Sequence, residues 1–174
     1  MLFRSNGSTV YQLDTPRAVS ITIGTGTIVA TNVTISGYDY YGQAMSEVIS
    51  TGTTQSTTVE GLKAFFQVSS VAVAGDCGGT ISVGTTDIIG LPVRVTDAAY
   101  IARAGYNNTL AANAGTFTAA ATATATTTTG DVRGTFAPNG ATDGIKRLVI
   151  GILLPAIAVG PNATRTGALG VTQA

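Results

Sequence analysis

The segment Val29-Ala30-Thr31-Asn32-Val33-Thr34-Ile35-Ser36 changes residue type at every step. β-branched residues stand at its odd-numbered positions, and small or polar residues stand between them. Successive side chains of a strand point to opposite faces of a sheet, so a period of two predicts a half-buried β-strand. The segment from Val19 to Ile23 repeats the pattern and ends at Gly24-Thr25-Gly26. These two segments therefore predict a protein built from β-strands.

The composition extends that prediction to the whole chain. Thr, Val and Ile supply 59 of the 174 residues. Their side chains lose rotamer freedom in helices and pack well on a pleated sheet. No segment carries a clear helix-period stripe, and eight to ten short strands recur at intervals of roughly ten residues. We therefore predict an all-β protein, an antiparallel β-sandwich of jelly-roll type.

The other predicted strands differ in how regular they are. A phase slip at Ser69-Ser70 predicts a β-bulge, because apolar residues are even-numbered before it and odd-numbered after it. Residues 98–130 give no firm assignment, and the Ala/Thr alternation within 119–129 fits an edge strand or a loop. Residues 145–154 are apolar on both faces, which predicts a central strand or one buried against another subunit. The more regular segments are 43–49, 63–74, 80–83, 88–95 and 131–137.

The chain length predicts one domain with two extended ends. Residues 1–17 and 160–174 are polar and irregular, and we expect them to form an N-terminal arm and a C-terminal tail. Residues 18–159 form the expected β-sandwich domain. The longest apolar run, 148–159, is interrupted by Pro155 and is shorter than the about 20 residues of a spanning helix. We therefore expect no membrane association.

The charges and the missing residue types exclude several kinds of site. The chain has no histidine and one cysteine, so it cannot build the usual Cys/His zinc site, an intrachain disulfide or a His-dependent triad. Nine acidic and nine basic residues cancel, which leaves no electrostatic footprint for nucleic acid. We expect no catalytic residue, no metal and no cofactor. Charged residues make up only 10% of the chain, against about 25% in an ordinary domain.

One short motif resembles a segment of an enzyme active site. Gly75-Asp76-Cys77-Gly78-Gly79 resembles the Gly-x-Cys-Gly-Gly segment of viral chymotrypsin-like cysteine proteases. Those enzymes use a histidine to accept the thiol proton, and this chain has none. At the usual cysteine pKa, only a few per cent of the thiol is ionised at neutral pH. We therefore interpret the motif as a Gly-rich turn between two strands.

Other candidate sites are weaker. Gly24-Thr25-Gly26 starts like a dinucleotide fingerprint, but Val29 occupies the third glycine position and no helix follows. The nine acidic residues are scattered, and no spacing selects the carboxylate pair of a glycosidase. The tyrosines form either a contact patch for glycans or partners, or caps on the core: Tyr38, Tyr40, Tyr41, Tyr100 and Tyr106. The excess of arginine over lysine favours either specific interface ion pairs or ordinary solvated charge.

Rather more than a third of the chain resembles small virion proteins of tailed bacteriophages, of the capsid-decoration or head-associated type. The resemblance rests mainly on turn and strand residues: 37–49, Lys63-Ala64-Phe65, 69–71, 79–85, Gly90-Leu91-Pro92, 128–135 and Asp143-Gly144. It implies structure rather than chemistry, because such proteins carry no catalytic signature.

The resemblance implies a non-enzymatic virion component, assembled in the host cytoplasm. We expect a cement or decoration protein that stabilises the capsid shell through contacts with the major capsid protein or other virion subunits. We expect it to be a homo-oligomer, with a trimer assumed because capsids offer three-fold positions. The alternative is a tail or head-fibre component that binds a host surface glycan.

Overall fold

The computed structural model describes residues 2–5, 8–110, 114–153 and 171–174. Within them lie eleven strands and one 3₁₀ turn, η1 (Ala98–Tyr100). The strands are β1 (Leu2–Ser5), β2 (Ser8–Ile23), β3 (Asn32–Tyr38), β4 (Ala44–Ser50), β5 (Thr58–Val73), β6 (Ile81–Gly90), β7 (Ile101–Tyr106), β8 (Thr109–Leu110), β9 (Gly115–Thr118), β10 (Thr135–Pro138) and β11 (Leu148–Ile152). The prediction of an all-β chain is confirmed.

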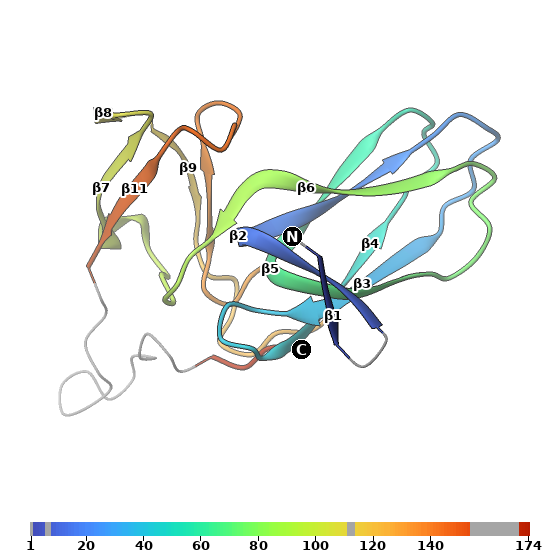
Figure 1. Ribbon diagram of the computed structural model, residues 1–174, viewed down its shortest axis with the longest axis horizontal. Helices are drawn as coiled ribbons and strands as arrows, with labels where there is room; N and C mark the ends of the chain where they lie inside the picture. The colour runs from blue at the N-terminus through green and yellow to red at the C-terminus, as the bar shows by residue number, and fades with distance from the viewer. Residues whose placement is uncertain (1, 6–7, 111–113, 154–170) are drawn as a thin grey trace.

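The strands form a large and a small antiparallel sheet (Figure 1). The large sheet has the order β4-β3-β5-β2-β6-β10-β9, and β1 pairs with the first part of β2. The small sheet has the order β11-β7-β8. This arrangement is consistent with the predicted β-sandwich, and the strand order does not confirm jelly-roll connectivity.

The main core lies on the inner face of the large sheet. Val19 and Ile21 of β2 pack in one cluster with Val33 and Ile35 of β3, and all four are at most 1% exposed. β2 and β5 have 16 residues each, and register shifts interrupt their pairing. Such shifts bend strands, and Figure 1 shows β2 and β6 crossing in front of β3 and β4. The bend lets one sheet bury its own apolar face.

The predicted bulge in β5 is confirmed. Ser36 of β3 pairs with Ser70, whereas the next residue, Gly37, pairs with Val68, so Ser69 is the extra residue. The Ser69 hydroxyl donates a hydrogen bond to the Ser36 carbonyl at 3.0 Å. Because the bulge restores the inward direction of the side chains after it, even-numbered Val68 and odd-numbered Val71 share one face of the sheet.

A second core cluster joins the small sheet to the large one. Leu91, Val95, Ala114 and Phe136 are buried there, and the inner side chains of β11 pack against them. β11 alternates between half-buried and exposed residues and pairs with β7 at one edge of the small sheet. The prediction that residues 145–154 form a central strand is therefore wrong, because apolar composition alone does not distinguish an edge strand with one exposed apolar face.

Three other segments differ from their predictions. β6 runs from Ile81 through Gly84 to Gly90, so the predicted strands at 80–83 and 88–95 are replaced by one strand that stops before Pro92. β10 begins at Thr135 because the Asp131 side chain holds the preceding residues in a turn. β3 begins at Asn32, and Val29 instead donates its N–H to the Cys77 carbonyl at 2.9 Å.

The residues assigned to the terminal arms are only partly described. Residues 8–17 form the first half of β2, where Tyr11 pairs with Val68 and Arg17 pairs with both Phe65 and Ile89. Most of the C-terminal tail lies outside the described residues. Its last residues, 171–174, are described and contact the large sheet.

Replacing Gly37 by alanine is expected to destabilise the fold. A Cβ at this position would lie 1.9 Å from the Gln67 carbonyl oxygen, opposite the bulge, so the β3–β5 pairing must shift. We expect Gly37→Ala to lower the free energy of unfolding by about 2–3 kcal/mol in urea titrations. Gly75→Ala is the matched control, because the nearest atom to its Cβ is 3.8 Å away. Equal effects of the two substitutions would contradict this interpretation.

Candidate functional site

The Gly75–Gly79 motif is a turn between β5 and β6, as predicted. Cys77 is buried, and its thiol donates a hydrogen bond to the Gly79 carbonyl at 3.0 Å. The Asp76 carboxylate accepts the Gly78 N–H at 2.8 Å. Gly78 adopts a φ of +74°, and a Cβ there would meet the Thr27 carbonyl, so glycine is required by geometry. Both polar side chains of the motif therefore take part in shaping the turn.

Several charged side chains lie in the interior of the fold rather than on its surface. Six described ones are buried, three acidic and three basic: Asp39, Glu47, Lys63, Arg94, Asp131 and Arg133. An uncompensated buried charge costs several kcal/mol, so each of these requires partners. Five of the six lie in two linked groups, one around Asp39 and Arg133 and the other around Glu47, Lys63 and Asp131.

Asp39 and Arg133 form a buried ion pair. The two side chains are 1% and 6% exposed, and the Arg133 Nη2 to Asp39 Oδ2 distance is 2.6 Å. The other Asp39 oxygen accepts the N–H groups of Tyr41 and Gln43, both at 2.8 Å, which closes the turn between β3 and β4. The guanidinium lies over the Tyr41 ring, 4.9 Å from its centroid. One ion pair thus fixes a turn to a segment 94 residues away.

Asp131 joins the same segment to β5. Its carboxylate accepts N–H groups from Ala64, Arg133 and Gly134, at 3.0, 2.7 and 3.2 Å. Burial is the largest influence on the pKa of Asp131 and raises it, while these hydrogen bonds act in the opposite direction. The side chain therefore replaces a regular strand ladder between residue 64 and the turn at 131–134.

Glu47 of β4 and Lys63 of β5 bind backbone groups of each other's strands, which β3 separates in the sheet order. The Glu47 carboxylate accepts the Leu62 N–H at 2.5 Å and the Lys63 N–H at 3.3 Å. The Lys63 ammonium donates to the Ser46 carbonyl at 2.9 Å, and its residue is 0% exposed. Burial raises the pKa of Glu47 and lowers the pKa of Lys63. These groups pack β4 against β5.

Sequence reasoning missed these interactions as a site. Segments 37–49, 63–65 and 128–135 carry predicted strand residues, candidate tyrosines and the family resemblance, but no pattern links their charged residues. The structure brings all three segments together. No local spacing relates Asp39 to Arg133, so only the tertiary fold reveals the pair. For Arg133 and Arg94 the interpretation as solvated surface charge is wrong, because both are buried.

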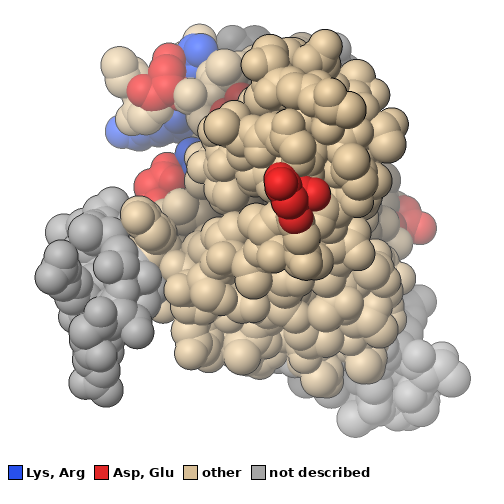
Figure 2. All heavy atoms as spheres, turned by 90° about the vertical axis from the view of Figure 1, so that its right-hand side faces the viewer, with Lys and Arg blue, Asp and Glu red and all other residues tan. Residues whose placement is uncertain are grey.

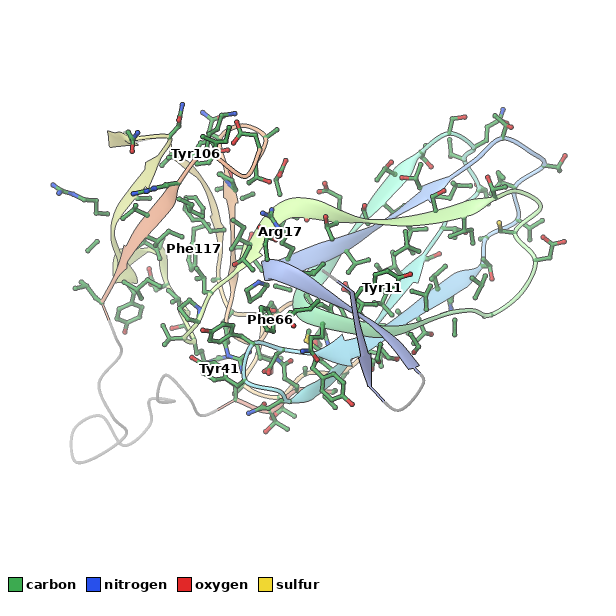
Figure 3. The ribbon with its side chains drawn as sticks, viewed as in Figure 1. Tyr11, Arg17, Tyr41, Phe66, Tyr106 and Phe117 are labelled. Atoms are coloured by element: carbon green, nitrogen blue, oxygen red, sulfur yellow. The ribbon has the colours of Figure 1, made fainter. Side chains whose placement is uncertain are left out.

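The tyrosines divide between two places (Figure 3). Tyr38, Tyr40 and Tyr41 remain 40–56% exposed at the β3–β4 turn, where Tyr40 contacts Tyr41 and Phe66 edge to face. The Tyr41 hydroxyl donates to the Pro92 carbonyl at 2.7 Å. Tyr106 lies in the small sheet and is 8% exposed. The predicted five-residue patch is therefore not one surface.

Exposed apolar side chains gather beside β11. Ile145, Val149 and Leu153 are 86%, 58% and 56% exposed. The outward residues of β11 carry no charge, and in the described part of the chain only β7 pairs with this strand. An apolar edge strand of this kind is a template for association unless another surface covers it.

One end of the large sheet is almost without charge. Three loops form it, at residues 24–31, 51–57 and 74–80, and Asp76 is the only charged residue in these ranges. Figure 2 views this end and shows one acidic group within a broad uncharged area, with other charged groups only toward the edges of the view. Depletion of charge is typical of the centres of protein interfaces.

Three comparisons, with protein-family models, curated proteins and solved structures, found no match for this chain. No helix among the described residues is long and apolar enough to cross a membrane. The same residues contain no group of three or more Cys, Asp or Glu side chains placed to hold a metal ion.

The buried ion pair predicts unequal effects of two Asp→Asn substitutions. Asp39→Asn leaves the Arg133 cation buried without its anion, so we expect a loss of about 3–5 kcal/mol in the free energy of unfolding. Asp14 also pairs with an arginine, Arg17, but its side chain is 68% exposed. Asp14→Asn is expected to cost about 0–1 kcal/mol. Urea titration of both variants tests this, and similar losses would contradict a special role for the buried pair.

Glu47→Gln is expected to change the pH dependence of stability. Because the pKa of Glu47 is raised from 4.5 in the fold, the folded state loses stability as pH rises from that value through the raised pKa. Glutamine has no such proton to lose. Relative to the unsubstituted protein, the variant should become more stable as pH rises above 4.5. A stability difference that is constant across this range, measured by urea titration, would contradict the prediction.

Proposed function

We propose that this protein is a non-enzymatic structural component of a bacteriophage virion, a cement or decoration protein that joins capsid subunits. The observation that carries the proposal is the exposed apolar row Ile145, Val149 and Leu153 on and beside the edge strand β11. A partner strand or surface would remove these side chains from water, at about 25 cal/mol for each Å² buried.

The distribution of charge supports an assembly role. Three acidic and three basic side chains are buried within the fold, where they hold turns and strands together. Few charges remain for the surface of a chain that is only 10% charged. A neutral end and an apolar strand edge suit permanent contacts, since obligate interfaces are more apolar than ordinary protein surfaces.

The partners of this proposal are the major capsid protein or other virion subunits, together with further copies of the chain. The protein would act within the particle after assembly in the host cytoplasm, and its role would be to hold subunits together. Such a role requires complementary surfaces and needs no activated nucleophile. The hydrogen bond from the buried Cys77 thiol to Gly79 is in keeping with this.

The tyrosine cluster supports a second candidate, a fibre or tail component that binds a host glycan. Tyr38, Tyr40 and Tyr41 present half-exposed rings at one turn, and such rings stack on the apolar faces of sugars. Two of these rings already have intramolecular partners in Phe66 and the Pro92 carbonyl. We therefore place this candidate second.

The proposal is tested with virions of the phage whose genome encodes the chain. Particles stripped of the protein are mixed with purified chain, and the bound fraction is measured by sedimentation. We expect binding, and we expect Val149→Asp to weaken it at least tenfold, because the charge enters the apolar row. Leu62→Asp is the matched control, since Leu62 is equally exposed (57%) but lies on β5.

Point substitutions are preferable to removal of the first 17 residues. Residues 8–17 belong to β2, which lies between β5 and β6, so deleting them would remove sheet pairing as well as a contact. Absence of the protein from purified particles would overturn the proposal. Binding to host polysaccharide that Tyr40→Ala abolishes would favour the glycan candidate instead.

A further inference from the structure

The last four residues of the chain, 171–174, lie against a surface formed by β4 and residues 123–127, which is called the groove. The Ser46 N–H of β4 donates to the Ala174 carbonyl oxygen at 2.6 Å. In Figure 1 the C-terminal end lies below the large sheet, whereas β11 belongs to the small sheet on the other side of the molecule. The end of the chain therefore does not pack beside the strand that precedes it in the sequence.

Backbone hydrogen bonds hold Thr172 beside residues 123–125. The Thr172 N–H donates to the Ala123 carbonyl at 2.8 Å, and the Thr172 carbonyl accepts the Ala125 N–H at 2.9 Å. Thr124 and Thr172 form a parallel bridge. A further bond from the Val48 N–H to the Thr127 carbonyl ties the same loop to β4. The groove thus binds an extended peptide by β-augmentation.

Buried side chains at the floor of the groove also contact the segment. Lys63, which is 0% exposed, donates from Nζ to the Ala174 carbonyl at 3.4 Å. The Gln173 side-chain N–H donates to Asp39 Oδ2 at 3.4 Å, on the carboxylate that pairs with Arg133. The groove therefore combines backbone pairing with recognition of one side chain by a buried charge.

Hydrogen bonding between Gln173 and the groove is incomplete when the segment binds its own chain. The Gln173 Oε1 and Arg133 Nε atoms are both buried, and neither has a hydrogen-bond partner among the described residues. Burying an unsatisfied polar group opposes the bound state. A few hydrogen bonds anchor the segment, and the two unsatisfied polar atoms partly cancel the free energy that these bonds contribute. This balance favours a segment that can dissociate and rebind.

The covalent connection allows the segment to reach another molecule. Eighteen peptide links separate Leu153 from Val171, and a chain of that length spans at most roughly 60 Å. This limit exceeds the diameter of about 40 Å expected for a compact sphere whose radius of gyration is that of a domain of this size. The groove in a neighbouring copy therefore lies within covalent reach.

We propose that the groove between β4 and residues 123–127 is an acceptor site for residues 171–174 of a second copy of the chain. Each copy donates its last strand and receives one, so the hydrogen bonds present within one chain are re-formed between chains. Exchange of an identical element costs little because the contacts are the same in both states. This inference goes beyond the proposed function, since strand exchange does not depend on a virion partner.

Disulfide trapping distinguishes the two arrangements. Thr124 and Thr172 are both exposed and are bridge partners. Paired strand residues lie about 5 Å apart, within reach of a disulfide. The full-length chain carrying Thr124→Cys and Thr172→Cys in a Cys77→Ala background is oxidised at several protein concentrations and analysed by non-reducing denaturing electrophoresis and mass spectrometry. The two single-cysteine variants serve as controls.

We expect the double variant to form disulfides between position 124 of one chain and position 172 of another, identified by mass spectrometry, which neither single-cysteine control can form. We expect the unsubstituted chain to sediment as an oligomer. If the covalent species end at two or three chains, that number is the number of copies in a closed oligomer formed by strand exchange, and this result would support the proposal. A disulfide formed only within single chains at every concentration would overturn the proposal. Failure to form either disulfide would do so as well, because the segment would then not occupy the groove.

Discussion

The Asp39–Arg133 ion pair is the interaction on which the arrangement of this protein depends. It joins the β3–β4 turn to the turn that precedes β10, so it ties the β4–β3 side of the large sheet to the segment leading into β10 of the same sheet. Asp131, two residues earlier, extends the connection to β5 through the Ala64 N–H. In the low-dielectric interior these bonds are strong when complete and costly when one partner is missing. The junction therefore favours one relative placement of strands that apolar packing alone would leave less defined.

The buried charges also explain how a charge-poor chain obtains a specific fold. Apolar contacts around Val33 and Ile35 supply the hydrophobic burial, but they are nondirectional, and a shift of the pairing by two residues would keep the same face buried. Carboxylates that accept two or three backbone N–H groups do not tolerate such shifts. Glu47 fixes β4 against β5 in this way, and Asp131 fixes a turn where a strand was predicted. Specificity in this molecule therefore comes largely from a few polar side chains placed inside it.

Features that depend on local periodicity could be predicted from the sequence. The strands around Val19 and Val33 and the bulge at Ser69 follow from alternation and its interruption, and the structure confirms them. The ends of strands were less predictable, because the Asp131 side chain competes with the ladder and Pro92 lies beyond the end of β6. The Asp39–Arg133 junction could not be predicted, since its partners are 94 residues apart and no spacing rule links them. The sequence shows that residues 145–154 are largely apolar. Whether these side chains face a core or a surface depends on the position of β11 in its sheet, which the sequence does not reveal.

The position of β11 and the position of residues 171–174 bear on each other. If the last strand stays in its own molecule, the chain must return from the edge of the small sheet to β4 of the large sheet. If it passes to a neighbour, the return is unnecessary and the connecting residues hold the two molecules together. The exposed Val149 and Leu153 are apolar side chains that are costly in an isolated chain, and a second molecule held nearby would be available to cover them. Association of two copies would thus provide a reason for both the groove and the uncovered edge.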